Sequence, residues 1–361
     1  MKKPIKLFDP HVGKGEEKIV QKVLKSKFWA SGAGIGYVKK FENSFKKYVG
    51  SKECIAVNSG TAALNLSLSL FDLKNREIIL PSMTFASTAH AAVLNGGKPV
   101  FVDIDENTLC INTNEIKKNI TKKTKAVVLV HFAGMPCNLD KIRAICKMNN
   151  LLLIEDAAHA AGSRYKNKRI GSHGDAVCFS FHPVKNLAMP SGGLITINHP
   201  SYKDIRRKLI ARRWCGITNR QGSNYDIEEI GWNYYMNEFS AAIGLEQLKK
   251  LDKMNSKRRK IAYRYNKEIN LYNKIPFAKD CSYHLYWIRI KKREKIMKIL
   301  AEKGIETGVH YKPLHKMSFY KTNKKLPITD KVGKEILSIP IHPNLTNNDV
   351  DFIIKEINKI C

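Results

Sequence analysis

Lys185 stands out among the 63 lysines and arginines of this chain because no other charged residue lies near it in the sequence. Its segment, SFHPVKNLAMPSGG, follows an apolar, strand-like run that ends at Ser180, and it finishes in a diglycine. A lysine held away from bulk water loses part of its preference for the ammonium form, so its neutral amine becomes available as a nucleophile. Taken alone, a single lysine is more often an ordinary surface residue.

Three further features precede this lysine at points where apolar runs end. In VNSGTAAL, Gly60 and Thr61 lie between a strand and a helix, where free backbone N–H groups and the positive helix end favour an anion. In TFASTAH, Phe85 follows a strand end and could cover a flat ring, and Asp156 ends the apolar run LLLIED. Each feature also has an ordinary structural explanation: a turn glycine, a core aromatic residue or a helix-capping carboxylate.

In combination these residues are far more specific than any one of them. Pyridoxal phosphate needs backbone donors for its phosphate, an amine that bonds to its aldehyde, and a carboxylate that keeps its ring nitrogen protonated. Gly60 and Thr61, with the hydroxyl of Ser180, supply the first requirement. Lys185 and Asp156 supply the other two. The sequence therefore predicts a pyridoxal-phosphate enzyme in which Lys185 and Asp156 are catalytic.

The segments that must position these residues alternate between short apolar runs and helical patterns. Runs such as EIILPS, KAVVLVHF and LLLIED, with helices between them, predict an α/β fold with a mainly parallel sheet covered on both faces. DAVCFS and GGLITIN predict a hairpin beyond the parallel set. A long helix that begins at the capping residue Asn237 leads out of this region. We therefore expect a large domain over residues 1–250, N-terminal helices included, and a small α+β domain over 251–361.

Composition limits the other functional classes. The formal charge of +31 would suit a polyanionic partner, but the basic residues are dispersed and no nucleic-acid module is visible, so we expect no nucleic-acid binding. The eight cysteines form no CxxC pair and no zinc spacing, which predicts reduced cytoplasmic thiols and no metal. The longest uncharged stretch contains Pro81 and Asn95, and we expect no membrane span.

The motifs together resemble the DegT/DnrJ-type sugar-nucleotide aminotransferases, a family of fold-type-I pyridoxal-phosphate enzymes. The resemblance extends nearly end to end, because NSGTAAL, PSMTFASTAHA, IEDAAHAAG, SFHPVKNL, NYYMNEFSAAIGLEQL and HYKPLH follow one another in the order this family uses. It implies an aspartate-aminotransferase-like fold, with a mainly parallel, seven-stranded sheet between helices and a smaller C-terminal domain.

The resemblance also implies roles for individual residues. Lys185 would bond to the aldehyde of pyridoxal phosphate and then move the proton as the cofactor alternates between pyridoxal and pyridoxamine phosphate, while Asp156 would face the ring nitrogen. His159 would lie beside the ring hydroxyl and Phe85 would stack on the ring. The implied phosphate contacts are the backbone of Gly60, Thr61 and Ala62, the hydroxyl of Ser180 and, from a neighbouring subunit, Asn233. The implied substrate contacts are His310, Tyr311, His315 and the turn at positions 31 and 32, which is Ser31–Gly32.

The activity implied is transfer of an amino group from L-glutamate to a nucleotide-linked keto-sugar, with a 4-keto-6-deoxy hexose favoured, for glycan or surface-polysaccharide biosynthesis. A cytoplasmic homodimer with shared active sites is implied as well. The chain departs from the family pattern at Pro190–Ser191, Tyr235 and His90, which leaves the sugar unassigned. The alternatives are an aminotransferase acting on a 3-keto sugar or a cyclitol, a pyridoxal-phosphate dehydratase, and a non-catalytic relative that binds nucleic acid.

Overall fold

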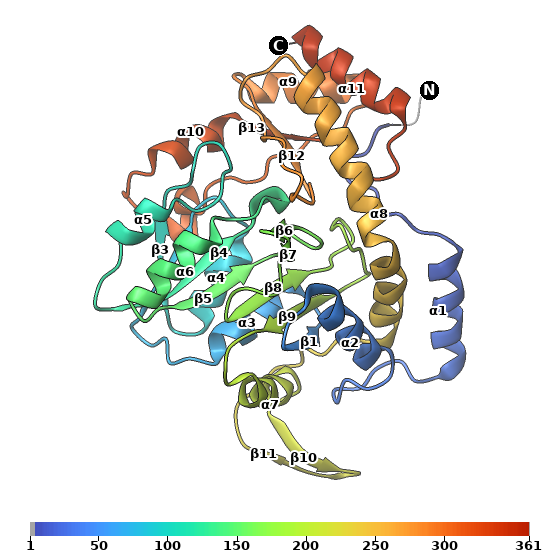
Figure 1. Ribbon diagram of the computed structural model, residues 1–361, viewed down its shortest axis with the longest axis vertical. Helices are drawn as coiled ribbons and strands as arrows, with labels where there is room; N and C mark the ends of the chain where they lie inside the picture. The colour runs from blue at the N-terminus through green and yellow to red at the C-terminus, as the bar shows by residue number, and fades with distance from the viewer. Residues whose placement is uncertain (1–3, 361) are drawn as a thin grey trace.

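A seven-stranded sheet forms the centre of the computed structural model, which describes residues 4–360 (Figure 1). In spatial order its strands are β1 (Glu53–Val57), β9 (Gly193–Ile197), β8 (Ala176–Ser180), β5 (Leu152–Asp156), β4 (Thr124–Val130), β2 (Glu77–Pro81) and β3 (Lys98–Val102). The pairs from β8 to β3 are parallel, whereas β9 is antiparallel to both of its neighbours. The expected mainly parallel sheet and the β8–β9 hairpin are both confirmed.

Helices cover both faces of this sheet because alternate residues of each strand point to opposite sides. In β1, Ile55 belongs to one apolar core and Ala56 to the other. The Ile55 core includes side chains from α3 (Gly60–Ser69), α4 (Ala86–Leu94) and α7 (Tyr202–Arg213). The Ala56 core includes side chains from α2 (Tyr37–Val49), α5 (Thr113–Lys118) and α6 (Leu139–Met148). α2 ends where Gly50 takes a left-handed conformation, as its sequence predicts.

The long helix α8 (Glu238–Glu268) connects the sheet to the C-terminal part of the chain (Figure 1). It begins at the predicted cap, since the side chain of Asn237 accepts a hydrogen bond from the backbone N–H of Ser240 at 2.8 Å. It continues through residue 250 without a break and packs against α1 (Lys14–Ser26) and α2. The division near residue 250 stays a prediction.

The C-terminal part is built around a two-stranded sheet of β12 (Tyr286–Arg289) and β13 (Ile336–Ile339). Its other elements are α9 (Arg293–Glu302), the 3₁₀ turns η2 (Leu314–Lys316) and η3 (Ser318–Tyr320), α10 (Pro327–Glu335) and α11 (Asn347–Ile360). The N-terminal segment packs here as well: Ile5 forms a parallel bridge with Ile305, and the backbone N–H of Leu7 donates to Glu306 at 3.0 Å. The N-terminal segment therefore lies against the C-terminal part of the fold.

Three small elements complete the fold. The short strands β6 (Arg164–Tyr165) and β7 (Lys168–Arg169) pair with each other, and a 3₁₀ turn, η1 (Phe132–Gly134), follows β4. A hairpin of β10 (Ile217–Gln221) and β11 (Asn224–Ile227) projects from the body of the molecule beyond α7 (Figure 1). Across residues 4–360, no helix combines the length and the apolar character that crossing a bilayer requires.

Candidate active site

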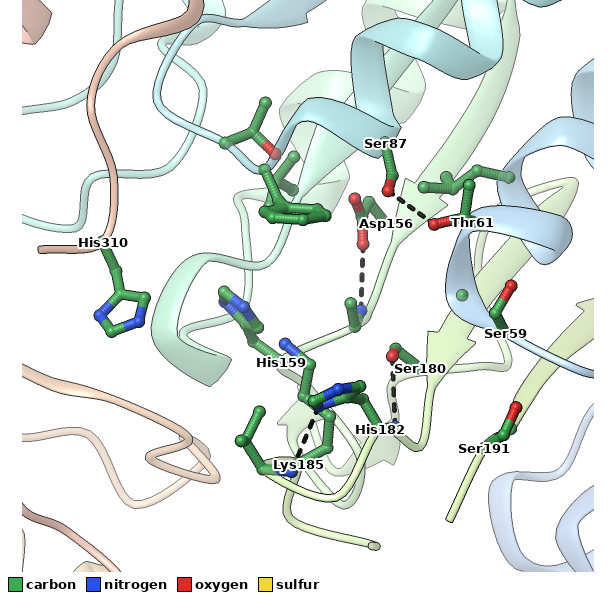
Figure 2. A pocket seen from close by; sticks show the side chains of 18 of the residues that line it. Ser59, Thr61, Ser87, Asp156, His159, Ser180, His182, Lys185, Ser191 and His310 are labelled. Atoms are coloured by element: carbon green, nitrogen blue, oxygen red, sulfur yellow. Dashed lines mark hydrogen bonds between the residues drawn. The ribbon is translucent and has the colours of Figure 1, made fainter. Parts of the chain in front are cut away.

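A cavity of about 540 Å³ opens at the edge of the sheet where parallel strands present their carboxyl ends (Figure 2). Asp156 is the last residue of β5 and Ser180 the last residue of β8, while Gly60 is the first residue of α3, which follows β1. In open α/β sheets this edge is the usual place for a ligand. The cavity is lined by Phe8, Gly60, Thr61, Phe85, Asp156, His159, Ser180, Lys185, His310 and Tyr311, among others.

Asp156 is buried, with an exposed fraction of 5%, and two donors hold its carboxylate. The Thr88 hydroxyl donates to Oδ2 at 2.8 Å, and the backbone N–H of Ala158 donates to Oδ1 at 3.1 Å. Burial raises the pKa of this carboxyl, while the two hydrogen bonds and the charge of Lys185 lower it in part. A fixed, buried carboxylate of this kind can hold a proton on a ligand group in front of it.

Lys185 lies in the segment between β8 and β9, where its backbone N–H donates to His182 at 2.8 Å. Its side chain is accessible only in part, and the surrounding protein lowers the pKa of the amine to about 8, against a smaller opposing effect of Asp156. At neutral pH a substantial minority of the amine is therefore uncharged. This agrees with the chemistry expected from its uncharged sequence neighbours.

An anion site is formed where α3 begins opposite Ser180. A Cβ atom placed on Gly60 would come within 2.7 Å of the Ser180 Cβ, so this close approach of the two segments requires a glycine. The Thr61 hydroxyl lies 2.6 Å from that of Ser87 and lines the same cavity (Figure 2). Hydroxyls and the first N–H groups of a helix converge here, which is an arrangement that suits a phosphate.

Three rings lie on the side of the cavity away from the anion site. Phe85 is 59% exposed although it lines the cavity, so one apolar ring is open to a ligand. His159 stacks on Tyr311 with ring centroids 6.0 Å apart. The His159 Nδ1 accepts from the backbone N–H of Ala133 at 3.3 Å, so its proton is on Nε2, which donates to the Tyr311 hydroxyl at 3.0 Å.

Several residues expected near the ligand lie outside this cavity lining. The backbone N–H of Ala62 donates to the Ser59 hydroxyl at 3.1 Å. Asn233 is exposed, and its backbone carbonyl accepts from Asn58 at 3.2 Å. The Ser31–Gly32 turn packs against Trp214. His315 is buried between Ser82 (2.6 Å) and Asp330 (2.9 Å), both of which bond to its ring. A role for Asn233 in a neighbouring subunit stays a prediction.

The structure also places residues at the site that sequence reasoning missed. His284 Nε2 lies 3.4 Å from the Lys185 Nζ, and Phe8 stacks on the His284 ring at 5.6 Å. Neither residue carries a local signal, because Phe8 reaches the cavity and His284 reaches Lys185 from distant segments. Thr88 follows Phe85 by one helical turn in TFASTAH, and this spacing could have identified it as facing the same strand ends.

A mainly parallel sheet with a partly buried lysine and a buried aspartate at its carboxyl edge is typical of one class, the pyridoxal-phosphate enzymes of fold type I. A model of the DegT/DnrJ/EryC1/StrS aminotransferase family matches residues 10–358. The chain therefore belongs to this family, and it is a pyridoxal-phosphate-dependent aminotransferase. Among curated proteins it is similar to the spore coat polysaccharide biosynthesis protein SpsC of Bacillus subtilis, with 36% identity over 97% of this chain and 95% of the relative.

Solved structures agree with this assignment. PseC of Helicobacter pylori, an aminotransferase involved in pseudoaminic acid biosynthesis, superimposes with a TM-score of 0.93 and 28% identity over 99% of both chains. Spr1654 of Streptococcus pneumoniae, at 27% identity over 99% of this chain and 97% of its own, gives a TM-score of 0.93 in its PMP-form. Its PLP-form gives a TM-score of 0.92. The fold and the cofactor predicted from the sequence are confirmed.

Proposed function

We propose that this enzyme transfers an amino group from L-glutamate to a nucleotide-linked keto-sugar, with a 4-keto-6-deoxy hexose as the favoured acceptor. The observation that carries the proposal is the placement of the partly buried Lys185 and the buried Asp156 on one cavity, next to an anion site. The cavity volume of about 540 Å³ lies within the range of cofactor and substrate sites in general. The expected cytoplasmic location belongs to the same proposal.

The residues of this chain fit pyridoxal phosphate. Lys185 would hold the cofactor covalently and Asp156 would face its ring nitrogen, while Phe85 and His159 would contact the ring. The phosphate would lie at the start of α3, against Gly60, Thr61 and Ser180, with the N–H of Ala62 shared with Ser59. When bound, this cofactor supplies a conjugated ring that accepts the electron pair released at a substrate carbon.

Proton transfer falls to Lys185. Its pKa of about 8 lies close to neutral pH, which is the condition under which one group serves well as both acid and base. Asp156 is held by Thr88 and Ala158 and can keep its negative charge facing the ring nitrogen. The low accessibility of both side chains keeps water away from the amine and the carboxylate.

A sugar acceptor is supported by the relatives, since SpsC is a spore coat polysaccharide biosynthesis protein and Spr1654 is assigned as a sugar aminotransferase. Of the positions at which this chain departs from the family pattern, only Pro190 and Ser191 line the cavity. His90 instead hydrogen-bonds to Tyr320, and Tyr235 packs against Trp214. Any difference in sugar preference caused by these departures is therefore expected at Pro190–Ser191.

A homodimer is also part of the proposal. Asn233 is exposed near the base of the projecting β10–β11 hairpin and lies outside the cavity lining of its own chain. A neighbouring subunit could place this side chain at the partner's phosphate site. Mass photometry of the purified protein tests the oligomeric state, and a monomer with full activity would overturn shared active sites.

The direct test of the function uses absorbance and product formation. The purified protein with cofactor should absorb near about 420 nm, and borohydride or the Lys185→Ala substitution should abolish the band. A panel of nucleotide-linked 4-keto and 3-keto sugars is then incubated with L-glutamate, and 2-oxoglutarate and amino-sugar are measured. Keto-sugar consumption without a product amine would instead favour the dehydratase alternative, and the absence of a product amine from every nucleotide-linked keto-sugar would leave a cyclitol acceptor as the alternative.

A further inference from the structure

A second, much smaller cavity lies behind Lys185, on the side away from Asp156. Its volume of about 10 Å³ is close to the space that a single water molecule needs. It is lined by Lys185, His284, Arg258, His342 and Asp9, among others. Lys185 lines both cavities, so it forms part of the wall between them.

Three side chains of this small cavity have unused hydrogen-bonding groups. Within residues 4–360, Nε and Nη1 of Arg258, Nδ1 of His284 and Nδ1 of His342 are buried and lack a partner. All three side chains are at least nine-tenths buried, with exposed fractions of 5% for Arg258, 3% for His284 and 5% for His342. Buried polar groups are rarely left unsatisfied in native proteins, so a shared partner is required.

The tautomers of the two histidines follow from their other contacts. His342 Nε2 lies 3.0 Å from the backbone carbonyl of Lys6, which only accepts, so the proton is on Nε2 and Nδ1 offers a lone pair. Lys185 is mostly an ammonium at neutral pH and only donates, so His284 Nε2, 3.4 Å away, must accept. The His284 proton is then on Nδ1, which makes this nitrogen a donor.

One water can partner all three side chains. Its oxygen accepts from one Arg258 N–H and from the His284 Nδ1–H, which uses both of its lone pairs, and one of its hydrogens is donated to His342 Nδ1. A small anion would suit Arg258, but it would face the His342 lone pair and the carboxylate of Asp9, which also lines the cavity. We propose that His284 is a positioning residue for Lys185, and that a buried water shared with Arg258 and His342 keeps the His284 ring in its accepting tautomer.

His284 is well suited to this role because its position is fixed from several sides. Its backbone N–H donates to the Ala133 carbonyl at 2.9 Å, and its ring lies between Phe8 and His159, at centroid distances of 5.6 and 4.5 Å. Burial, the charge of Lys185 and that of Arg258 all lower the pKa of His284, so the ring stays neutral and able to accept. A neutral Lys185 that donates one N–H to His284 directs its lone pair away from that ring.

The test measures the reactivity of the Lys185 amine and needs no substrate, so its result does not depend on the proposed function. The inference rests on the proposed function only because that function makes this amine catalytic. In the full-length protein without cofactor, the acetylation of Lys185 by acetic anhydride is followed by mass spectrometry across a pH series. His284→Leu removes the acceptor that stabilises the ammonium. The labelling midpoint should fall from about 8 to about 7, and labelling at pH 7 should rise about fivefold.

Matched variants separate positioning from general loosening of the structure. His284→Gln retains an acceptor and should restore the midpoint toward that of the parent. His173→Leu removes a partly buried imidazole whose Nδ1 is also unpaired and which lines neither cavity, and it should leave the midpoint unchanged. A loosened structure would hydrate the amine and move the midpoint upward, opposite to the shift expected for His284→Leu. If His284→Leu does not fold, His284→Met provides the same comparison, because a thioether is a much weaker acceptor.

A crystal structure of the cofactor-free protein, grown with bromide, tests the other half of the inference. A water within hydrogen-bonding distance of Arg258, His284 and His342 is expected in the small cavity. Anomalous bromide density at this position would overturn the proposed water and the tautomer derived from it. A His284→Leu midpoint equal to that of the parent would overturn the positioning role.

Discussion

The hydrogen bond from Thr88 to Asp156 offers a sharp test of the site, because it can be removed without a change in side-chain shape. The Thr88 hydroxyl is fully buried and donates to Asp156 Oδ2 at 2.8 Å, and it also accepts from Thr84 at 2.8 Å. Thr88→Val deletes the donor. A hydrogen bond to a charged group contributes about 1.5 kcal/mol or more, which corresponds to about one pKa unit.

The sign of the effect follows from the charge state that the bond favours. Thr88 stabilises the ionised carboxylate and lowers the pKa of Asp156, which burial has already raised. Its removal should therefore raise the Asp156 pKa further. If pyridoxal phosphate binds tightly only while this carboxylate is ionised, the affinity falls as the pH falls. The acid limb of this affinity profile should lie about one pH unit higher in the variant than in the parent. Below that limb the variant should bind about tenfold more weakly than the parent.

The assay is a titration of the cofactor-free protein with pyridoxal phosphate at several pH values, followed by absorbance. Thr88→Ser retains the hydroxyl and is the matched control, which should reproduce the parent profile. Circular dichroism verifies that the valine variant is folded, since Thr84 loses an acceptor as well. A folded Thr88→Val protein with an unchanged acid limb would refute the role of this bond in keeping Asp156 ionised.

Two further predictions concern the anion site and the core. Gly60→Ala places a Cβ atom 2.7 Å from the Ser180 Cβ, so pyridoxal phosphate should bind at least about tenfold more weakly. The affinity for pyridoxal, which has no phosphate, should fall less. Equal losses for both ligands would place the phosphate elsewhere. Arg213→Met should lower the free energy of unfolding by about 3–5 kcal/mol in urea titrations. The reason is that the buried Glu42 carboxylate loses its nearest cation, the Arg213 guanidinium at 2.8 Å. Adding Glu42→Gln should recover part of that loss, and additive losses in the double variant would contradict the pairing.

Local sequence patterns predicted the parts of this protein that local physics determines. The apolar runs that end at Asp156 and Ser180 are strands, and the carboxyl ends of parallel strands meet at one edge of the sheet, so these residues could be expected together. The cap at Asn237 depends only on a few neighbouring residues, and it is confirmed. The combination of an anion site, a carboxylate and a lysine predicted the cofactor, and the family resemblance agreed with it.

The contacts that sequence reasoning missed are made between segments far apart in the chain. His284 is 99 residues from Lys185, and Phe8 reaches it because the N-terminal segment packs on the C-terminal part. No periodicity or spacing encodes such a meeting. The same limit explains why His315 was expected near the substrate: its motif is close to Tyr311 in sequence, but its ring turns toward Ser82 and Asp330.

Burial is the common cause of the pKa shifts of Lys185 and Asp156. Burial lowers the pKa of Lys185 and raises that of Asp156, so both groups lose preference for their charged forms in the same cavity. The charge of Asp156 favours the ammonium form of Lys185, and the charge of Lys185 favours the ionised form of Asp156. Asp156 also has two fixed donors, whereas within residues 4–360 the only hydrogen-bonding contact of the Lys185 amine is the one with His284 at 3.4 Å. The carboxylate is thus held more firmly than the amine, which suits a fixed partner for the ring nitrogen and a lysine that must move between bonding and proton transfer.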